Sequence, residues 1–301
     1  MERGADRLNR RADGGDWPGG ARAAVSITID NLGEAAEIEL GLRDPDAVPG
    51  GHYSVTTALP IVLATLADAG LSATFFVEGV NAEIYPQALH EIGAAGHELG
   101  YHAWCHEDWA SLDEAAEIAN LDRGLAAMRA LGIDVLGMRP PGGRLTEKTL
   151  GLLAGRGLRY CSPAGSAAGI DQVAVVPFAW PAVDAFHILP AFAPLRKRLT
   201  GDGEPGGPDA VRAALLESVE RALDGGAHAT LVLHTWLIEL ARDAVHDVLA
   251  RVGEAAEAGE LWVAPCYEAV AWMTSADRQG IGALPVGAPP VLDHTSWTAP
   301  A

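Results

Sequence analysis

Basic residues are scarce in this chain of 301 residues, in which 21 Lys and Arg stand against 40 Asp and Glu, a net charge of −19. Nucleic acids and anionic membrane surfaces both attract basic patches, so this balance argues against either as a partner. Cysteine is also rare, and the chain contains only Cys105, Cys161 and Cys266. These three are widely spaced and form no C-x-x-C pair. The sequence therefore predicts no disulfide framework, and a reducing compartment is the expected environment.

Long apolar runs are missing as well. No stretch approaches the roughly 18 apolar residues that a membrane-spanning helix needs, and residues 1–20 lack the apolar run of a secretory signal. We therefore expect a cytoplasmic protein that makes no membrane contact. The chain also contains no G-x-G-x-x-G and no Walker A motif, which leaves a dinucleotide or nucleoside triphosphate site without support.

Composition divides the chain into three parts. Residues 1–20 are charged and Gly-rich and are expected to be disordered. Residues 276–301 are rich in Pro and Gly, show no periodicity, and are expected to form an extended tail. Residues 21–275 lie between them as one folded domain, and the 49% of hydrophobic residues in the chain is enough for a large core.

Within residues 21–275, short apolar runs alternate with helical patterns. Strands are expected at 22–30, 72–79, 97–102, 134–140, 159–162, 173–178, 229–234 and 261–265, and helices at 57–70, 82–96, 146–155, 207–226 and 240–257. A further helix is expected from Ser111, because Ser111 and Glu114 form an S-x-x-E capping-box pattern. Such alternation predicts parallel strands buried on both faces, and seven or eight such units close most naturally into a (β/α) barrel.

Polar side chains stand where several of these strands end. They are Asp30, His102, His106, Arg139 and His234, which are far apart in the sequence. In a β/α barrel the active site lies at the carboxyl ends of the strands, so we expect these side chains to meet there. A satisfied polar cap is the alternative interpretation of any one of them taken alone.

His102 and His106 are four residues apart. On one helical turn this spacing places both imidazoles on the same face, where they could share a metal ion or form a satisfied surface pair. A catalytic metal needs about three protein ligands and an open position. The metal interpretation therefore requires an acid from another strand to converge on the two histidines.

Four phrases, in this order, resemble the polysaccharide deacetylase (NodB homology) family: "AVSITIDN", "GHELGYHAWCHED", "GMRPPGG" and "TLVLHTW". The resemblance runs from about residue 22 to 275, and the segment "VPFAWPAVD" is similar to the branch that contains allantoinase-like hydrolases. It implies a distorted (β/α) barrel as the catalytic domain. It also implies a divalent metal, zinc above all, with cobalt, nickel or manganese as other options, and hydrolysis of an N-acyl or related bond.

The resemblance also implies roles for individual residues. Asp30 corresponds to the catalytic base, Arg139 to the arginine that orients it, and His234 to the general acid. His102, His106 and Asn31 occupy the metal-binding positions. The residues expected to border the substrate are Pro141, Gly142, Trp180, Asp184 and Trp236.

The chain departs from the family at the metal site, where Asn31 replaces an aspartate in the phrase "TIDN". Three outcomes are open. In the first, Asn31 binds a metal with reduced affinity. In the second, Asp30 or Glu34 supplies the missing charge. In the third, the protein has lost the metal. Gly143, near where the family often carries an aromatic residue, suggests an altered pocket.

Three hypotheses for the function follow. The first is a metal-dependent N-deacetylase of a small intracellular substrate, such as an N-acylated amino sugar. The second is a ring-opening hydrolase of a cyclic amide or imide with the same residues in another pocket. The third is a binding protein that kept the barrel and lost its metal, which Asn31 motivates. The sequence carries no signal of oligomeric state.

Overall fold

The computed structural model describes residues 15–39, 41, 48–165, 169–170 and 172–275. The predicted tail at 276–301 and the first fourteen residues of the predicted disordered segment lie outside these ranges. The prediction of disorder is wrong for residues 15–20. Pro18–Gly20 form a short 3₁₀ helix, η1, and the indole of Trp17 stacks on Trp262 and donates a 3.0 Å hydrogen bond to the carbonyl of Gly226.

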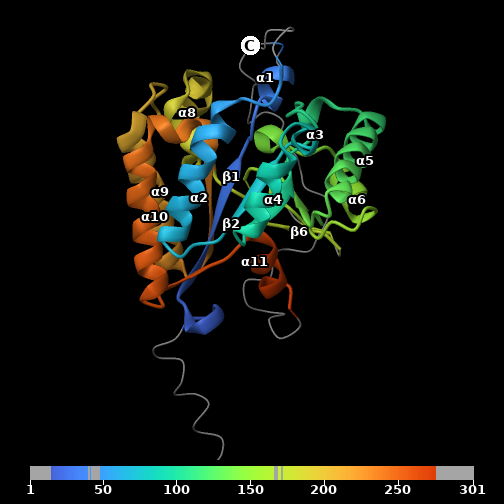
Figure 1. Cartoon of the computed structure of the whole chain (residues 1–301). Helices are drawn as coiled ribbons and strands as arrows, with labels where there is room; N and C mark the ends of the chain where they lie inside the picture. Colours follow the sequence, from blue (N-terminus) through green and yellow to red (C-terminus); the bar gives the residue numbers. More distant parts are fainter. Residues whose placement is uncertain (1–14, 40, 42–47, 166–168, 171, 276–301) are drawn as a thin grey trace, which may run out of the picture.

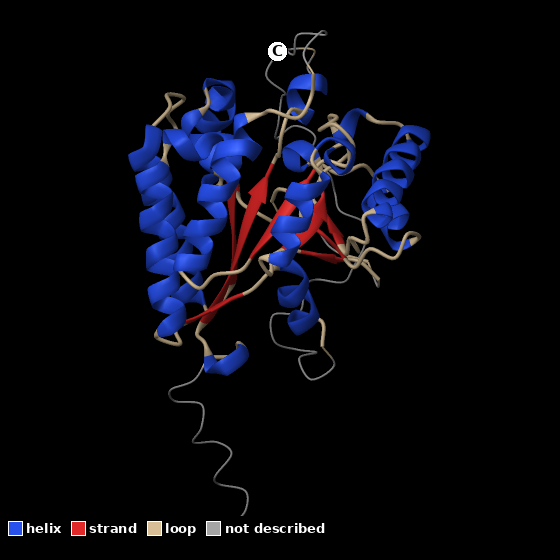
Figure 2. Cartoon of the chain, viewed as in Figure 1, coloured by secondary structure: helices blue, strands red, loops and turns tan. Residues whose placement is uncertain are grey.

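Eight parallel strands form one sheet that curves into a distorted barrel, as predicted (Figure 2). They are β1 (Ala23–Asp30), β2 (Ala73–Val77), β3 (Glu98–Tyr101), β4 (Gly137–Met138), β5 (Tyr160–Cys161), β6 (Ala174–Val175), β7 (His228–His234) and β8 (Leu261–Val263). Seven of them lie within a range expected from the sequence, and β7 begins one residue before its expected range, at His228. All eight residues of β1 are buried, as the continuous apolar run predicts for a strand covered on both faces.

The order of the strands explains the distortion of the barrel. They follow one another as β6-β5-β4-β3-β2-β1-β7, and β8 also pairs with β1. β7 pairs along β1 from Ala24 to Asp30, whereas β8 pairs with the first residues of β1 and β2 with the last four. In the described residues β6 does not pair with β7. An isolated backbone bridge between Val183 and Val232 links β7 to the segment after β6.

Helices surround the sheet. The longer ones are α2 (Leu59–Asp68), α4 (Pro86–Ala94), α5 (Glu114–Ala130), α8 (Ala193–Thr200), α9 (Gly207–Gly225), α10 (Arg242–Glu257) and α11 (Cys266–Met273). The shorter α-helices are α1 (Ala35–Glu39), α3 (Asn81–Ile84), α6 (Thr149–Ala154) and α7 (Asp184–Ile188). α2, α9 and α10 lie together on one side and α5 and α6 on the other, while α11 lies below the sheet at its amino end (Figure 1).

Short turns complete the connections. They are η2 (Ser54–Ala58), η3 (Trp109–Ser111), η4 (Pro141–Gly143), η5 (Trp180–Ala182), η6 (Pro190–Phe192) and η7 (Thr235–Leu240). The predicted cap of α5 at Ser111 is wrong, because Asp113 accepts a 2.8 Å hydrogen bond from the amide of Ala116 and Ser111 bonds back to the carbonyl of Asp108. No helix in the described part of the chain is long and apolar enough to cross a membrane.

Candidate active site

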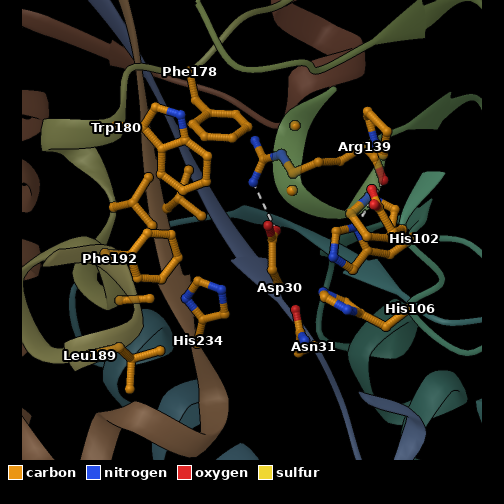
Figure 3. Close-up of a pocket in the computed structure, with 18 of the residues that line it drawn as sticks. Asp30, Asn31, His102, His106, Arg139, Phe178, Trp180, Leu189, Phe192 and His234 are labelled. Carbon is orange, nitrogen blue, oxygen red and sulfur yellow. Dashed lines mark hydrogen bonds and ion pairs between the residues drawn. The ribbon is translucent and has the colours of Figure 1, made fainter. Parts of the chain in front are cut away.

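A cavity of about 390 Å³ opens at the carboxyl ends of β1, β3, β4 and β7. Ten of the residues predicted for the site line it: Asp30, Asn31, His102, His106, Arg139, Pro141, Gly142, Trp180, His234 and Trp236. The structure therefore confirms the prediction that the strand ends bring these distant polar side chains into one cavity. Figure 3 shows Asp30 in the middle, His102 and His106 on one side, and His234 on the other.

Asp30 is held by an arginine. Its side chain, 5% exposed, accepts a 2.7 Å hydrogen bond at Oδ1 from the Arg139 guanidinium, which comes from the end of β4. Burial raises the pKa of the Asp30 carboxyl, and the nearby Arg139 charge opposes that rise. The carboxylate is thus fixed in orientation while one oxygen remains beside the cavity, which is the arrangement that a general base requires.

The guanidinium of Arg139 is held by further hydrogen bonds and by two aromatic rings. It donates to the hydroxyl of Thr28 at 2.7 Å and to the hydroxyl of Ser162 at 2.8 Å, and it lies between the rings of Phe76 and Phe178, at 4.4 and 4.9 Å from their centroids. The alternation of β1 could have revealed Thr28, because it shares a face with Asp30. Nothing in the sequence singled out Ser162 or Phe76.

His234 is held by Asp184, which we predicted to border the substrate. Asp184 does not line the cavity. Its buried carboxylate accepts from Nδ1 of His234 at 2.6 Å and from the backbone amide of His234 at 2.8 Å. Burial lowers the pKa of His234, but the charge and hydrogen bond of Asp184 outweigh it, so that the net pKa is raised. Asp184 therefore orients an imidazole and favours its protonated form.

The two histidines of the H-x-x-x-H phrase meet, but not on a helix. Their ring centroids are 5.1 Å apart. The backbone between them makes a tight turn in which Ala103 and His106 have positive φ angles of 63° and 70°, so the helical argument for their convergence is wrong. Glu107 fixes the turn by accepting hydrogen bonds from the amides of Trp104 and Cys105 at 3.0 and 2.9 Å.

Both imidazoles are suited to bind a cation. Nδ1 of His102 donates a 2.8 Å hydrogen bond to the carbonyl of Arg139, which leaves Nε2 as the free lone pair. Burial lowers the pKa of His102 well below its usual range and that of His106 to about 4. Both rings are therefore neutral at physiological pH, which is the form that ligates metals.

Asn31 supplies the third candidate donor. It follows Asp30 with a positive φ of 60°, and its side-chain oxygen is buried without a hydrogen-bond partner. Among the described residues, no group of three or more His, Cys, Asp or Glu could hold a metal ion. An unpartnered amide oxygen beside two neutral imidazoles (Figure 3) fits a divalent cation in donor type, although without the charge of a carboxylate.

The alternative that Glu34 supplies the missing charge is wrong for this conformation. Glu34 is buried away from the cavity, where its carboxylate accepts hydrogen bonds from the hydroxyl of Tyr85 at 2.6 Å and from the amide of Gly50 at 2.9 Å. Two other acids that sequence reasoning missed, Glu39 and Asp108, do line the cavity.

The fold and the site define a (β/α)-barrel protein with a buried carboxylate, an opposed imidazole and a cluster of neutral metal-competent donors. Residues 46–161 match the family model described as polysaccharide deacetylase. A chitin deacetylase from Pestalotiopsis sp is 33% identical over 113 residues, which are 36% of this chain and 36% of that protein. The alignments span about a third of the length of the first curated relatives.

Solved structures cover more of the chain. A protein from Mycobacterium smegmatis assigned as a polysaccharide deacetylase superposes with a TM-score of 0.73 at 25% identity, covering 86% of this chain and 92% of that one. An allantoinase structure superposes with a TM-score of 0.69 at 18% identity, covering 87% and 93%. The resemblance to the polysaccharide deacetylase family that the motifs predicted is confirmed by the family model over residues 46–161, and the fold agrees with it over most of the chain.

Proposed function

We propose that the protein is a hydrolase of a carbon–nitrogen amide bond in a small molecule and removes an acyl group from nitrogen. One observation carries this proposal. Asp30 and His234 face the same cavity, and each is held by a buried partner at hydrogen-bond distance, Arg139 at 2.7 Å and Asp184 at 2.6 Å. A paired base and acid, each oriented by a third group, is the arrangement that general acid–base hydrolysis needs.

In this proposal the base and the acid move the two protons of the reaction. Asp30 accepts a proton from the attacking water, and the resulting hydroxide oxygen forms a bond to the acyl carbon. His234, whose protonated form is favoured because Asp184 raises its pKa, gives a proton to the amide nitrogen as the carbon–nitrogen bond breaks. The products are a carboxylic acid and an amine, and Arg139 keeps Asp30 aligned throughout.

His102, His106 and Asn31 are the residues that would hold a divalent metal ion, with zinc, cobalt, nickel and manganese as the ions to test. When bound, such an ion acts as a Lewis acid on the acyl oxygen and on water. The neutral donor set argues for weaker binding than a set that includes a carboxylate.

The test is a turnover screen with the full chain. N-acetyl, N-formyl and cyclic amides are incubated with each of the four metals and with chelator, and the release of free amine or the opening of the ring is followed. We expect metal-stimulated hydrolysis that falls at least about 100-fold in Asp30→Asn and in His234→Gln. The control is His246→Gln, because His246 is exposed on α10 and does not line the cavity.

Two results would count against the proposal. Unchanged turnover in both site variants would remove Asp30 and His234 from the chemistry. No hydrolysis of any amide with any metal, together with saturable binding of the same compounds, would favour a binding protein instead. Calorimetric titration with each of the four metal ions reports separately on the donors, because a chain that binds none of them has no metal site whatever its activity.

A further inference from the structure

One side of the cavity is apolar. We call this side the apolar wall, and it consists of Phe178, Trp180, Val183, Leu189, Phe192 and Val232. In Figure 3 its labelled members lie across Asp30 from His102 and His106. The wall thus faces the two imidazoles over the carboxylate that we propose as the base.

The aromatic part of the wall is tightly packed. The ring of Trp180 is 5.4 Å from that of Phe178 and 5.2 Å from that of Phe192, centroid to centroid. The backbone of Phe178 is bonded on both sides, since its amide donates to Pro163 at 3.0 Å and its carbonyl accepts from Gly165 at 2.8 Å. These rings therefore form a fixed surface that a ligand meets without reordering it.

The same segment also holds the proposed acid. Phe178, η5, α7 and η6 follow one another along the chain, and Asp184, the first residue of α7, binds His234. A group that rests on the apolar wall is therefore held directly beside the imidazole. The wall and the acid–base pair belong to one site.

The wall offers little to a sugar. Of its six side chains only Trp180 carries a hydrogen-bonding group, its indole N–H. Arg139, which lines the same cavity, is occupied by Asp30, Thr28 and Ser162. Each sugar hydroxyl buried there without a partner would lower affinity roughly 5- to 150-fold, whereas each buried methylene would raise it roughly fourfold.

We propose that the substrate is a small amide bearing an apolar group, preferably an aromatic ring of about benzyl size, and that the apolar wall binds this group. The inference rests on the hydrolase function proposed above. A cavity of about 390 Å³ is near the lower end of the range for small-molecule sites, which suits such a compound. The group is attached either on the acyl side or on the amine side of the bond.

Four uncharged amides test the proposal. N-benzylacetamide carries the ring on the amine side and N-methyl-2-phenylacetamide on the acyl side, while N-methylacetamide and N-acetylglucosamine carry no aromatic group. Binding is measured by calorimetry on the full-length Asp30→Asn variant, so that turnover does not consume the ligand, and kcat/KM is measured on the unaltered chain with added metal. We expect at least one aromatic amide to bind tenfold or more tightly than N-methylacetamide.

Wall variants locate the effect. Leu189→Ala and Phe192→Ala should each reduce the advantage of the aromatic amide over N-methylacetamide by about tenfold. Both side chains are only partly buried, so the variants are expected to fold, which circular dichroism checks. The matched control is Leu199→Ala, because Leu199 on α8 is 49% exposed and lies outside the cavity lining.

The outcomes separate this inference from the hydrolase proposal. If N-acetylglucosamine binds more tightly than both aromatic amides, or if both wall variants leave the aromatic advantage unchanged, the apolar wall does not bind the substrate. That conclusion would hold even with N-acetylglucosamine hydrolysed, which would leave the hydrolase proposal intact. A different result would be tight binding of an aromatic amide that the wall variants weaken, without hydrolysis of any amide. It would support the apolar wall as a binding site for the aromatic group and refute the proposed hydrolase function.

Discussion

Glu78 makes the folding stability of this protein depend on pH. It follows β2 directly and is 0% exposed. Its Oε2 accepts hydrogen bonds from the amide of Leu32 and the side chain of Asn81, both at 3.1 Å, whereas Oε1 is buried with no partner. Burial raises the pKa of the Glu78 carboxyl from 4.5 to about 8.

The sign of the effect follows from proton linkage. The folded state holds the proton more tightly than the unfolded chain, so this stabilising contribution is complete below pH 4.5 and is lost as the pH rises through about 8. At about 1.4 kcal/mol for each pKa unit, the interval from 4.5 to about 8 corresponds to at most about 5 kcal/mol. That is a large part of the 5–15 kcal/mol that typically separates folded from unfolded domains.

The variant Glu78→Gln removes the titration, and its amide N–H₂ replaces the unpartnered oxygen. We expect the unaltered chain to lose several kcal/mol of unfolding free energy relative to this variant between pH 5 and pH 9. Urea unfolding followed by circular dichroism at each pH measures the difference. Glu147→Gln, at an exposed position, controls for loss of a carboxylate. A difference between the Glu78 variant and the unaltered chain that stays constant across this range would refute the reasoning.

Three further predictions concern the site and the helices. Asp184→Asn removes the charge that raises the pKa of His234, so the alkaline limb of the pH profile of kcat/KM should move to lower pH. An unmoved limb would contradict the pairing. Asn31→Asp should tighten binding of a divalent cation by about tenfold or more in calorimetry, and unchanged affinity would exclude this position as a donor. Gly124→Ala would place a Cβ 2.2 Å from a buried tyrosine ring and should cost about 1–3 kcal/mol of unfolding free energy, whereas Gly93→Ala, in another helix with open space around it, should be neutral or stabilising.

The sequence alone was sufficient to predict where the strands lie and which polar residues stand at their ends. Apolar runs of limited length, separated by helical patterns, specify parallel strands because a strand covered on both faces can carry few polar residues. Asp30, His102, Arg139 and His234 were therefore placed at one end of a barrel before any contact was known, and the structure brings them to one cavity.

The tertiary structure alone decided how these residues are held. The spacing of His102 and His106 suggested a helix, but left-handed backbone at Ala103 and His106 brings the rings together, and periodicity does not encode such a turn. Asp184 was expected beside the substrate, yet its burial against His234 depends on a strand fifty residues further along the chain. Apart from Val232 on β7, the apolar wall likewise comes from the short irregular segments after β6, where no repeating pattern indicates which side chains face a cavity.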